Sequence, residues 1–342
     1  MTTKQPTERA DEGIVELDGR WHYAVGGLET MDPFLMSVVS DGDRWMFASS
    51  TGALTAGRVD ATGALFPYET DDRLHAARGA AGPVTRIRVS AGRDDDTALW
   101  RPFGDAPGEP VRRRLAKTLL GESVVFEEHH EALDITMRYR WDTTEEHGFV
   151  RTATLVNHGA APVHVDVLDG LVGLLPHGID PLLHQRFSNL TNAYERNELA
   201  DDVAGLAVIS LESPVSDQAE PAEVLRATVV WSHGLEGAEI VLDAAAVTAF
   251  DRGAAHPARP LVTGRPGAYL LRTALDLDPH GSVSWRIVAD VGRDQLAVAA
   301  LRRSLRSDDP PHLALDDAIA ATGARLEHIV VAADAASAPT TR

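Results

Sequence analysis

The segment SVVFEEHHEALDITMRYRW, residues 123–141, sets the interpretation of the whole chain. From Ile135 to Trp141 apolar and polar residues alternate. A period of two places successive side chains on opposite faces of a β-strand. A break near Glu131–Ala132 separates this run from the one before it. The segment therefore predicts a β-hairpin.

The same pattern occurs towards the N-terminus. IVELDGRWHYAV (14–25) turns at Asp18–Gly19, and FLMSVVSDGDRWMFAS (34–49) turns at Asp41–Gly42. Asp-Gly between two alternating runs is a strong signal for a two-residue hairpin turn. Both segments therefore predict further hairpins.

A fourth hairpin is expected in FVRTATLVNHGAAPVHVDVLDGL (149–171), with its turn at residues 157–159 and a tight turn at Asp169–Gly170. In all, about fifteen strands joined by short turns, without alternating helices, favour an antiparallel sandwich larger than one immunoglobulin-like unit. The sequence thus predicts a mainly β protein with a large two-sheet antiparallel β-sandwich.

Helical patterns are confined to three segments. SNLTNAYERNELADD (188–202) opens on a Ser of N-cap type and contains good helix formers. Residues 293–306 and 313–334 are amphipathic, and Thr322–Gly323 in the second indicates a kink. The expected parts of the chain are a disordered N-terminus (1–13), the sandwich (14–291), linker helices (292–334) and a disordered tail (335–342).

The composition of the chain narrows the classes of partner and the cellular compartment that we expect. The chain has 51 acidic and 32 basic residues, a net charge of −19. This charge repels phosphate backbones and anionic lipid, so we expect neither nucleic acid nor membrane as a partner, whereas a neutral sugar is compatible. Cysteine is absent, which fits a reducing compartment. No signal-peptide core and no span of about 18 apolar residues is present, so we expect a cytoplasmic protein.

The EEHHE run (127–131) invites a metal interpretation. On a strand, His129 and His130 face opposite sides, so they do not readily share one ion. Glu128 and His130 share a face, but a metal site needs three or four converging ligands. The favoured interpretation is a solvated strand end, and we expect no metal and no cofactor.

The segment LLPHGIDPLLHQRFSN (174–189) carries His177, Asp180 and His184, and its two prolines predict a loop. His177 and Asp180 are candidate binding residues. A sugar epimerase would need a His acid and a Glu or Asp base facing each other across a sheet. The chain has 14 histidines, and no spacing selects such a pair.

The stretch from Ser49 to Leu74 predicts a polar loop at one edge of the sandwich. Aromatic rings stack on sugar faces, and Arg and carboxylate groups hydrogen-bond to hydroxyls. In the alternative interpretation, Arg58 pairs with an acid inside the sandwich and residues 66–68 close its edge. The candidate substrate-binding residues in this stretch are Arg58, Tyr68, Glu69, Asp71 and Asp72.

Four segments together resemble a known family. They are FLMSVVSDGDRWMFASSTGALTAGRVDATGALFPYETDDRLH (34–75), TLVNHGAAPVHVDVLDGLVGLLPHGI (154–179), NLTNAYERNEL (189–199) and SPVSDQAEPAEVLRATVVWS (213–232). The sequence is similar to the N-terminal region of bacterial cellobiose phosphorylase-like or amylo-glucosidase-like proteins. The similarity spans most of residues 20–300, and 34–75 is its most specific part.

This resemblance implies a galactose mutarotase-like β-super-sandwich, then linker helices, then a catalytic α/α toroid that holds the general acid. The toroid would need hundreds of residues beyond Arg342. We therefore expect the sandwich of a glycoside hydrolase- or phosphorylase-like enzyme that acts on glucosides, inactive by itself and with no catalytic residue of its own. The expected partners are a carbohydrate, the missing toroid and, through exposed helix surface, a second copy of the chain.

Two alternatives remain. The chain is a stand-alone carbohydrate-binding or structural module, or it is a mutarotase-like sugar epimerase. Helical toroid sequence downstream of Arg342 would favour the first hypothesis over the stand-alone module.

Overall fold

The structure, a computed structural model, describes residues 12–90, 97–104, 110–213 and 225–336. Strands dominate this part of the chain, and the prediction of a mainly β antiparallel sandwich with C-terminal helices is confirmed. The expected disordered ends lie for the most part outside the described residues.

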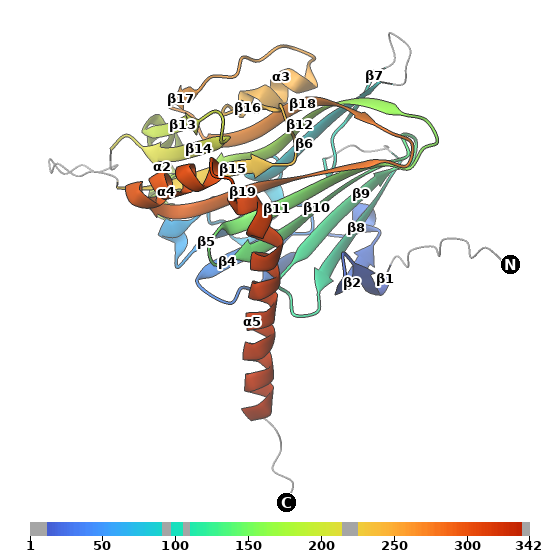
Figure 1. Cartoon of the computed structure of the whole chain (residues 1–342), viewed down its shortest axis with the longest axis horizontal. Coiled ribbons are helices and arrows are strands. Elements are labelled where there is room, and N and C mark those ends of the chain that lie inside the picture. Colours follow the sequence, from blue (N-terminus) through green and yellow to red (C-terminus); the bar gives the residue numbers. More distant parts are fainter. Residues whose placement is uncertain (1–11, 91–96, 105–109, 214–224, 337–342) are drawn as a thin grey trace, which may run out of the picture.

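Eleven of the described strands form one large antiparallel sheet (Figure 1). Its strand order brings β19 (Ser282–Asp294), late in the chain, between two groups of earlier strands. In order across the sheet, the strands are β1 (Glu12–Leu17), β2 (Arg20–Gly26), β8 (Val111–Thr118), β9 (Val124–His130), β10 (Ile135–Thr144), β11 (Gly148–Asn157), β19, β15 (Arg226–His233), β14 (Leu206–Leu211), β13 (Glu195–Asp201) and β17 (Leu261–Thr263).

Two smaller sheets pack against the inner face of the large sheet. The five-stranded sheet has the order β16 (Glu239–Val241), β18 (Gly267–Leu277), β12 (Val163–Leu174), β6 (Gly82–Ser90) and β7 (Thr97–Trp100). The three-stranded sheet contains β3 (Leu35–Val38), β4 (Arg44–Ser49) and β5 (Leu54–Arg58). One core joins all three sheets and includes the fully buried Trp100, Trp141 and Trp285.

The alternation in 123–141 explains this core. Met137, Tyr139 and Trp141 are buried on the inner face of β10, whereas Arg138 and Arg140 lie on the outer face. The predicted hairpins at Asp18–Gly19, Asp41–Gly42 and Glu131–Ala132 are present as the pairs β1–β2, β3–β4 and β9–β10.

The predicted hairpin over 149–171 is wrong. β11 pairs with β10 and β19, but β12 pairs with β6 and β18 in the opposite sheet. The Asn157 side-chain amide donates to the carbonyls of Ala161 and Asp278, at 2.9 and 3.0 Å. These bonds hold the connection as an arch between the sheets.

The predicted turn at Asp169–Gly170 is also wrong, because both residues lie inside β12. A Cβ on Gly170 would lie 2.1 Å from the carbonyl oxygen of Tyr269 on β18. Glycine is therefore required there by close strand pairing and not by a turn.

Helices occur in more places than expected. α2 (Pro181–Ala193) begins at Pro181, so the loop predicted for 174–189 ends there, and β13 replaces the second half of the helix predicted for 188–202. Proline fits this first helical position because its missing N–H would be unpaired there in any case. The remaining helices are α1 (Asp71–Ala76), α3 (Ala245–Asp251), α4 (Gln295–Leu305), α5 (Leu315–Ala336) and the 3₁₀ helices η1 (Leu28–Thr30), η2 (Ala61–Gly63) and η3 (Pro311–Ala314).

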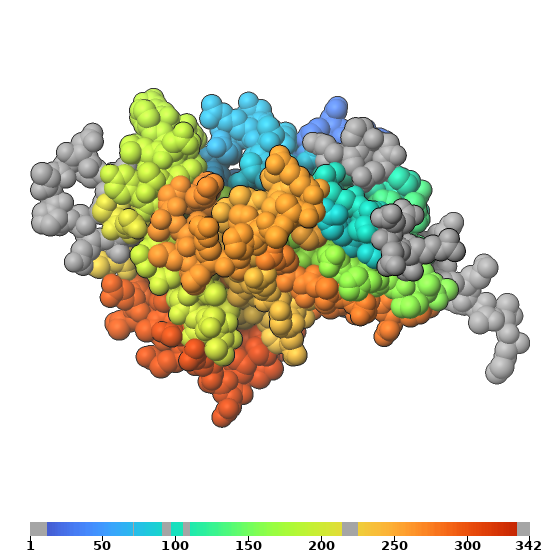
Figure 2. Space-filling view, turned by 90° about the horizontal axis from the view of Figure 1, so that it is seen from above, coloured from blue at the N-terminus to red at the C-terminus, as the bar shows by residue number. Residues whose placement is uncertain are grey.

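The C-terminal helices α4 and α5 lie on the outer face of the large sheet (Figure 1). Leu315 and Ile319 are buried against Val150 and Val288. α5 is continuous across Thr322, and its last turns extend beyond the sheet, where Ile329 is 52% exposed. In the space-filling view, α1 (light blue) and the C-terminal helices (red) lie on opposite sides of the molecule (Figure 2).

Candidate functional site

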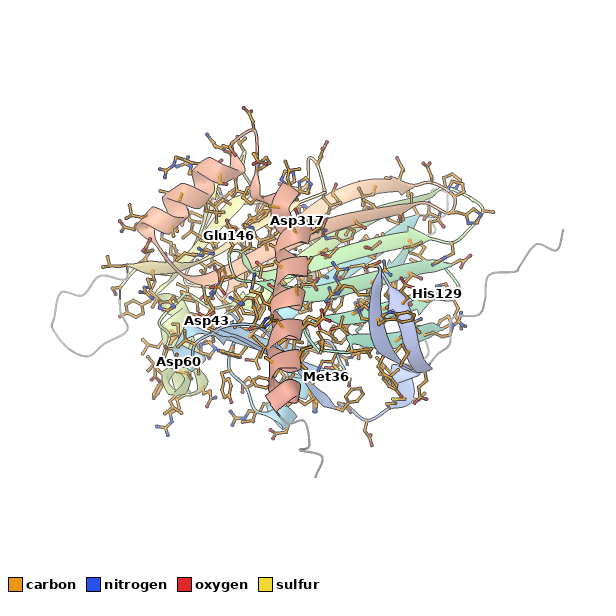
Figure 3. All side chains as sticks on the ribbon, turned by 60° about the horizontal axis from the view of Figure 1, so that its bottom comes forward. Met36, Asp43, Asp60, His129, Glu146 and Asp317 are labelled. Carbon is orange, nitrogen blue, oxygen red and sulfur yellow. The ribbon has the colours of Figure 1, made fainter. Side chains whose placement is uncertain are left out.

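The structure brings two of the predicted binding residues, Arg58 and His177, into one cleft of about 610 Å³ at the end of the sandwich. We call it the Arg58 cleft. It forms where β5 and β19 end, β15 begins and the β10–β11 turn passes. Asp43, Asp60 and Glu146 lie towards this end of the molecule, far from His129 (Figure 3). The charged residues and histidine that line it are Asp43, Arg58, Asp60, Glu145, Glu146, His177, Arg226, Asp290 and Arg293.

Arg58 forms the wall of the cleft. Its guanidinium donates to both carboxylate oxygens of Asp290, at 2.7 and 3.3 Å, and to Asp43 at 3.0 Å. A fourth bond reaches the carbonyl of Glu145 at 3.0 Å. Burial acts to lower the pKa of Arg58, but Asp290 and Asp43 raise it above its usual value. These contacts match the alternative in which Arg58 pairs with an acid of the sandwich.

His177 presents a nitrogen without a partner. Its Nδ1 is buried and accepts no hydrogen bond from the residues that the structure describes. Burial, helped by Arg226 and opposed by Asp60, lowers the pKa of His177, so the ring is neutral at pH 7. A neutral imidazole can donate one hydrogen bond and accept another.

The other predicted residues do not line this cleft. Tyr68 is 43% exposed, and its ring meets Trp45 edge-on at 5.6 Å. Asp180 caps α2 by accepting from the Leu183 N–H at 2.8 Å. Asp72 accepts from the Thr70 hydroxyl at 3.0 Å, and Glu69 lies 3.9 Å from Arg73. Asp71 is the first residue of α1.

The charge of the Arg58 cleft is negative. Five carboxylates face three guanidinium groups along its lining. Among the described lining residues, His177 has the only ring, so recognition in this cleft would rest on hydrogen bonds and not on stacking.

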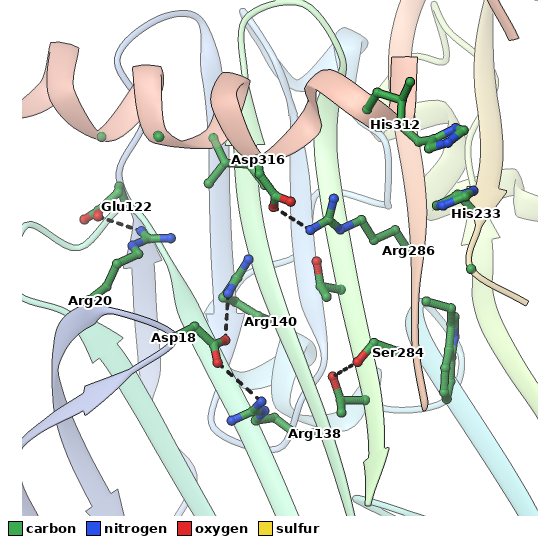
Figure 4. Close-up of a pocket in the computed structure, with 18 of the residues that line it drawn as sticks. Asp18, Arg20, Glu122, Arg138, Arg140, His233, Ser284, Arg286, His312 and Asp316 are labelled. Atoms are coloured by element: carbon green, nitrogen blue, oxygen red, sulfur yellow. Dashed lines mark hydrogen bonds and ion pairs between the residues drawn. The ribbon is translucent and has the colours of Figure 1, made fainter. Parts of the chain in front are cut away.

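A second and larger cleft, of about 1100 Å³, lies between the outer face of the large sheet and α5 (Figure 4). We call it the helix cleft. Its sheet side carries Arg138 and Arg140 of β10 and Arg286 of β19. The alternation in 123–141 places the two β10 arginines on the outer face, but strand order was needed to place β19 on the far side of β11 from them. This cleft was not found from the sequence.

Asp18 and Glu122, the carboxylates that the sheet and its turns contribute to the helix cleft, are ion-paired, as is the buried Asp142 beside them. Arg20 binds Glu122 at 2.7 Å and Asp142 at 2.9 Å, and Arg140 binds Asp142 at 2.6 Å and Asp18 at 2.8 Å. Burial acts to raise the pKa of Asp142, but Arg140 and Arg20 lower it below the usual value. A carboxylate held in its ionised form by two arginines is a poor proton acceptor.

The EEHHE run has structural contacts. The buried Glu128 accepts from the Trp100 indole, the Phe103 N–H and Arg113, each at 2.7 Å. His129 hydrogen-bonds to the Thr136 hydroxyl at 3.0 Å. Within the described residues, no group of three or more acidic or histidine side chains could hold a metal ion. None of the described helices has the length and apolarity to cross a membrane.

No family model matches the sequence, and no curated protein matches it. Solved structures that match this chain include a bacterial glucoamylase complexed with acarbose (TM-score 0.42, 10% identity, covering 80% of this chain and 34% of that chain). A polysaccharide lyase gives a TM-score of 0.38 at 14% identity, covering 76% of this chain and 32% of that chain. A protein assigned as an aldose 1-epimerase from Escherichia coli K12 gives a TM-score of 0.39 at 13% identity, and the match covers 76% of this chain and 99% of that chain.

This chain thus spans about a third of the glucoamylase and lyase chains. These neighbours are carbohydrate-active proteins, and similarities at this level indicate nothing about the activity of this chain.

Proposed function

We propose that the chain is the sugar-contacting sandwich of a carbohydrate-processing enzyme that acts on glucosides by hydrolysis or phosphorolysis, and that it is not catalytic by itself. The Arg58 cleft would contact the sugar. The observation that carries the proposal is the lining of this cleft, which combines five carboxylates, three guanidiniums and the unpartnered His177 Nδ1.

A neutral polyol suits such a lining. Sugar hydroxyls both donate and accept, so they can meet carboxylates, guanidiniums and a neutral imidazole at once. The side chain of Glu146 is 80% exposed, which leaves its oxygens available, whereas Glu145 already accepts from Arg44 at 2.8 Å. The excess of carboxylates disfavours anionic ligands. The volume of about 610 Å³ lies in the range of small-molecule sites.

The resemblance of residues 34–75 to cellobiose phosphorylase-like proteins supports the same proposal, because this segment supplies Arg58, Asp60 and Thr62 of the lining. A stand-alone sugar-binding module would use the same cleft. Enzyme activity separates these two possibilities. A stand-alone module would bind sugar, but no toroid domain would accompany it to hydrolyse or phosphorolyse the sugar.

Titration calorimetry of the full chain with cellobiose, maltose and glucose 6-phosphate tests the proposal. We expect the neutral sugars to bind and the phosphate ester to bind more weakly. His177→Ala and Glu146→Gln should each weaken sugar binding about tenfold, the value of one hydrogen bond. His328→Ala, an exposed histidine on α5, is the matched control and should bind as the wild type. Equal binding by all variants, or no sugar binding at millimolar concentrations, would contradict the proposal.

A further inference from the structure

The outer face of the large sheet carries a row of three outward side chains under α5. Arg140 of β10 lies opposite Thr152 of β11, and Thr152 lies opposite Arg286 of β19. All three line the helix cleft (Figure 4). Neighbouring strands are about 4.8 Å apart, so the two long arginine side chains can converge over the threonine between them.

These residues form a set of hydrogen-bond donors. The side chains of Arg140 and Arg286 are 13% and 19% exposed, so both guanidiniums are largely shielded from water. The hydroxyl of Thr152 is buried and has no partner among the described residues. Forked guanidinium groups match the geometry of carboxylate and phosphate oxygens, and a free hydroxyl adds a third donor.

A carboxylate of the chain itself lies at the Arg286 end of this row. Asp316, in the first turn of α5, accepts from Nη2 of Arg286 at 2.5 Å (Figure 4). Asp316 also acts on Arg140. Burial acts to lower the pKa of Arg140, but Asp142, Asp18 and, least, Asp316 raise it above its usual value. The carboxylate of Asp316 thus bonds to Arg286 and acts on Arg140 only through its charge.

The contact with Asp316 is replaceable. Its side chain is 73% exposed, and exposed ion pairs contribute little to stability. By contrast, Asp142 is 2% exposed and stays bound to Arg140 and Arg20. On the sheet and its turns, Arg20, Arg138, Arg140 and Arg286 face Asp18, Glu122 and Asp142, and across the cleft α5 adds Glu327 to Asp316.

We propose that Arg140, Thr152 and Arg286 form an oxyanion site that Asp316 of α5 occupies at its Arg286 end, and that a carboxylate or phosphate group of a ligand takes when Asp316 moves away. Thr154 and Ser284 line the cleft beside the row, and their hydroxyls bond to each other at 2.8 Å. The cleft of about 1100 Å³ has room there for the body of an acidic or phosphorylated sugar. Binding of such a ligand would release the start of α5 from the sheet.

The test uses the full chain with Asp316→Asn, which removes the internal carboxylate. Asp317→Asn is the matched control, because Asp317 is exposed, lies on the same helix and does not line the cleft. Inorganic phosphate, glucuronate and glucose are titrated at fixed ionic strength, with calorimetry or amide chemical shifts as the readout. Asp316→Asn should bind an anion about ten- to a hundredfold more tightly than Asp317→Asn, and neither should gain affinity for glucose.

The two anions distinguish the sources of the oxyanion. Binding of glucuronate alone would identify a carboxylate site, binding of phosphate alone a phosphate site, and binding of both a site for any compact oxyanion. Adding Arg286→Gln to Asp316→Asn should abolish the gain. Equal affinities of the Asp316 and Asp317 variants, or a gain that survives Arg286→Gln, would overturn the proposal. In the wild type, hydrogen exchange at residues 313–320 should rise when the anion is added, which does not depend on any variant folding correctly.

Discussion

Arg151 of the large sheet and Asp169 of the five-stranded sheet form a two-point ion pair, at 2.6 and 2.9 Å, in which neither side chain is exposed. Asp169 also accepts from the Thr85 hydroxyl and the Trp285 indole, each at 2.6 Å. The guanidinium of Arg151 lies 4.8 Å from the ring centre of Tyr139. With four bonds to the Asp169 carboxylate, this pair holds the two sheets in one register.

Removing one partner of this pair should be costly. Asp169→Ala leaves the buried Arg151 charge without its carboxylate, so we expect a loss of roughly 3–5 kcal/mol in unfolding free energy. The double variant Arg151→Met with Asp169→Leu should recover most of that loss, because no charge remains buried. Urea denaturation measures both. A double variant as unstable as Asp169→Ala would show that the pair is irreplaceable by apolar packing.

Because of the buried carboxyl group of Glu195, we expect the free energy of unfolding to fall as pH rises. Its Oε2 accepts from the Gly267 N–H at 3.0 Å, its Oε1 has no partner among the described residues, and burial raises the pKa of Glu195 to about 8. The folded state therefore binds an extra proton between the unfolded pKa near 4.5 and about 8, and stability declines across that window.

Glu195→Gln should remove this decline. The variant should match the wild type near pH 5 and exceed it by roughly 2–4 kcal/mol near pH 9, as measured by denaturation at each pH. Glu198→Gln, on the same strand but 44% exposed, is the control and should leave the pH profile unchanged. Parallel profiles for wild type and Glu195→Gln would rule out the buried acid as the cause.

The two halves of α5 should respond differently to truncation of a side chain. Leu315 is fully buried, so Leu315→Ala should lower unfolding free energy by about 2–5 kcal/mol. Ile329 is 52% exposed, so Ile329→Ala should change it by less than about 0.5 kcal/mol. Hydrogen exchange should show residues 327–336 as the fast part of the helix, or sedimentation should show self-association that covers them. A monomer with strong protection along all of α5 would contradict this prediction.

Because Asp201 binds α4 to the large sheet, we expect α4 to detach from the sheet in acid. Its side chain is buried on β13 and accepts from Arg302 and Arg306 of α4, at 2.7 and 2.8 Å. The bond from Arg306, with help from the Ala204 N–H and Arg302, lowers the pKa of Asp201 well below its usual range. This stabilisation is present above the unfolded pKa near 3.8 and is lost as pH falls through the folded pKa.

Exchange of the α4 amides, followed from pH 6 downward, measures the effect. Asp201→Asn should already show at pH 6 the faster exchange that the wild type reaches only in strong acid. Asp202→Asn, the neighbouring exposed residue, should behave as the wild type. Identical exchange in the Asp201 variant would assign the docking of α4 to apolar contacts alone.

Local patterns predicted strands well and their partners less well. The alternation around Met137 and Tyr139 gave the hairpin β9–β10 and the buried face, because burial on one side follows from period two. The same signal could not tell whether β11 and β12 share a sheet, since an arch and a hairpin carry the same turn residues at Asn157–Gly159. Helix formers in Glu195–Asp201 were overruled by pairing with β14 and β17, which is tertiary context.

For the candidate sites, too, local residues could be predicted from the sequence, but their partners in space could not. The polar segment around Arg58 was identified from composition, and the structure places Arg58 beside His177, 119 positions later in the chain. The spacing of residues in the sequence could not connect Asp290 with Arg58, to which it hydrogen-bonds. It could not connect Asp316 with Arg286 either. Their proximity depends on the strand order across β19 and on where α5 docks.

The position of β19 constrains how the protein is made on the ribosome. β19 pairs with β11 on one side and β15 on the other, so in the described sheet it is the strand that connects the two halves. During synthesis, the strands made before residue 282 form two partial sheets whose facing edges lack a partner. Such edges invite intermolecular pairing, and their closure requires contacts between residues far apart in the sequence, which slows folding. Nascent chains that stop before residue 282 should therefore depend on chaperones and aggregate without them, whereas chains released after Asp294 should close the sheet cooperatively.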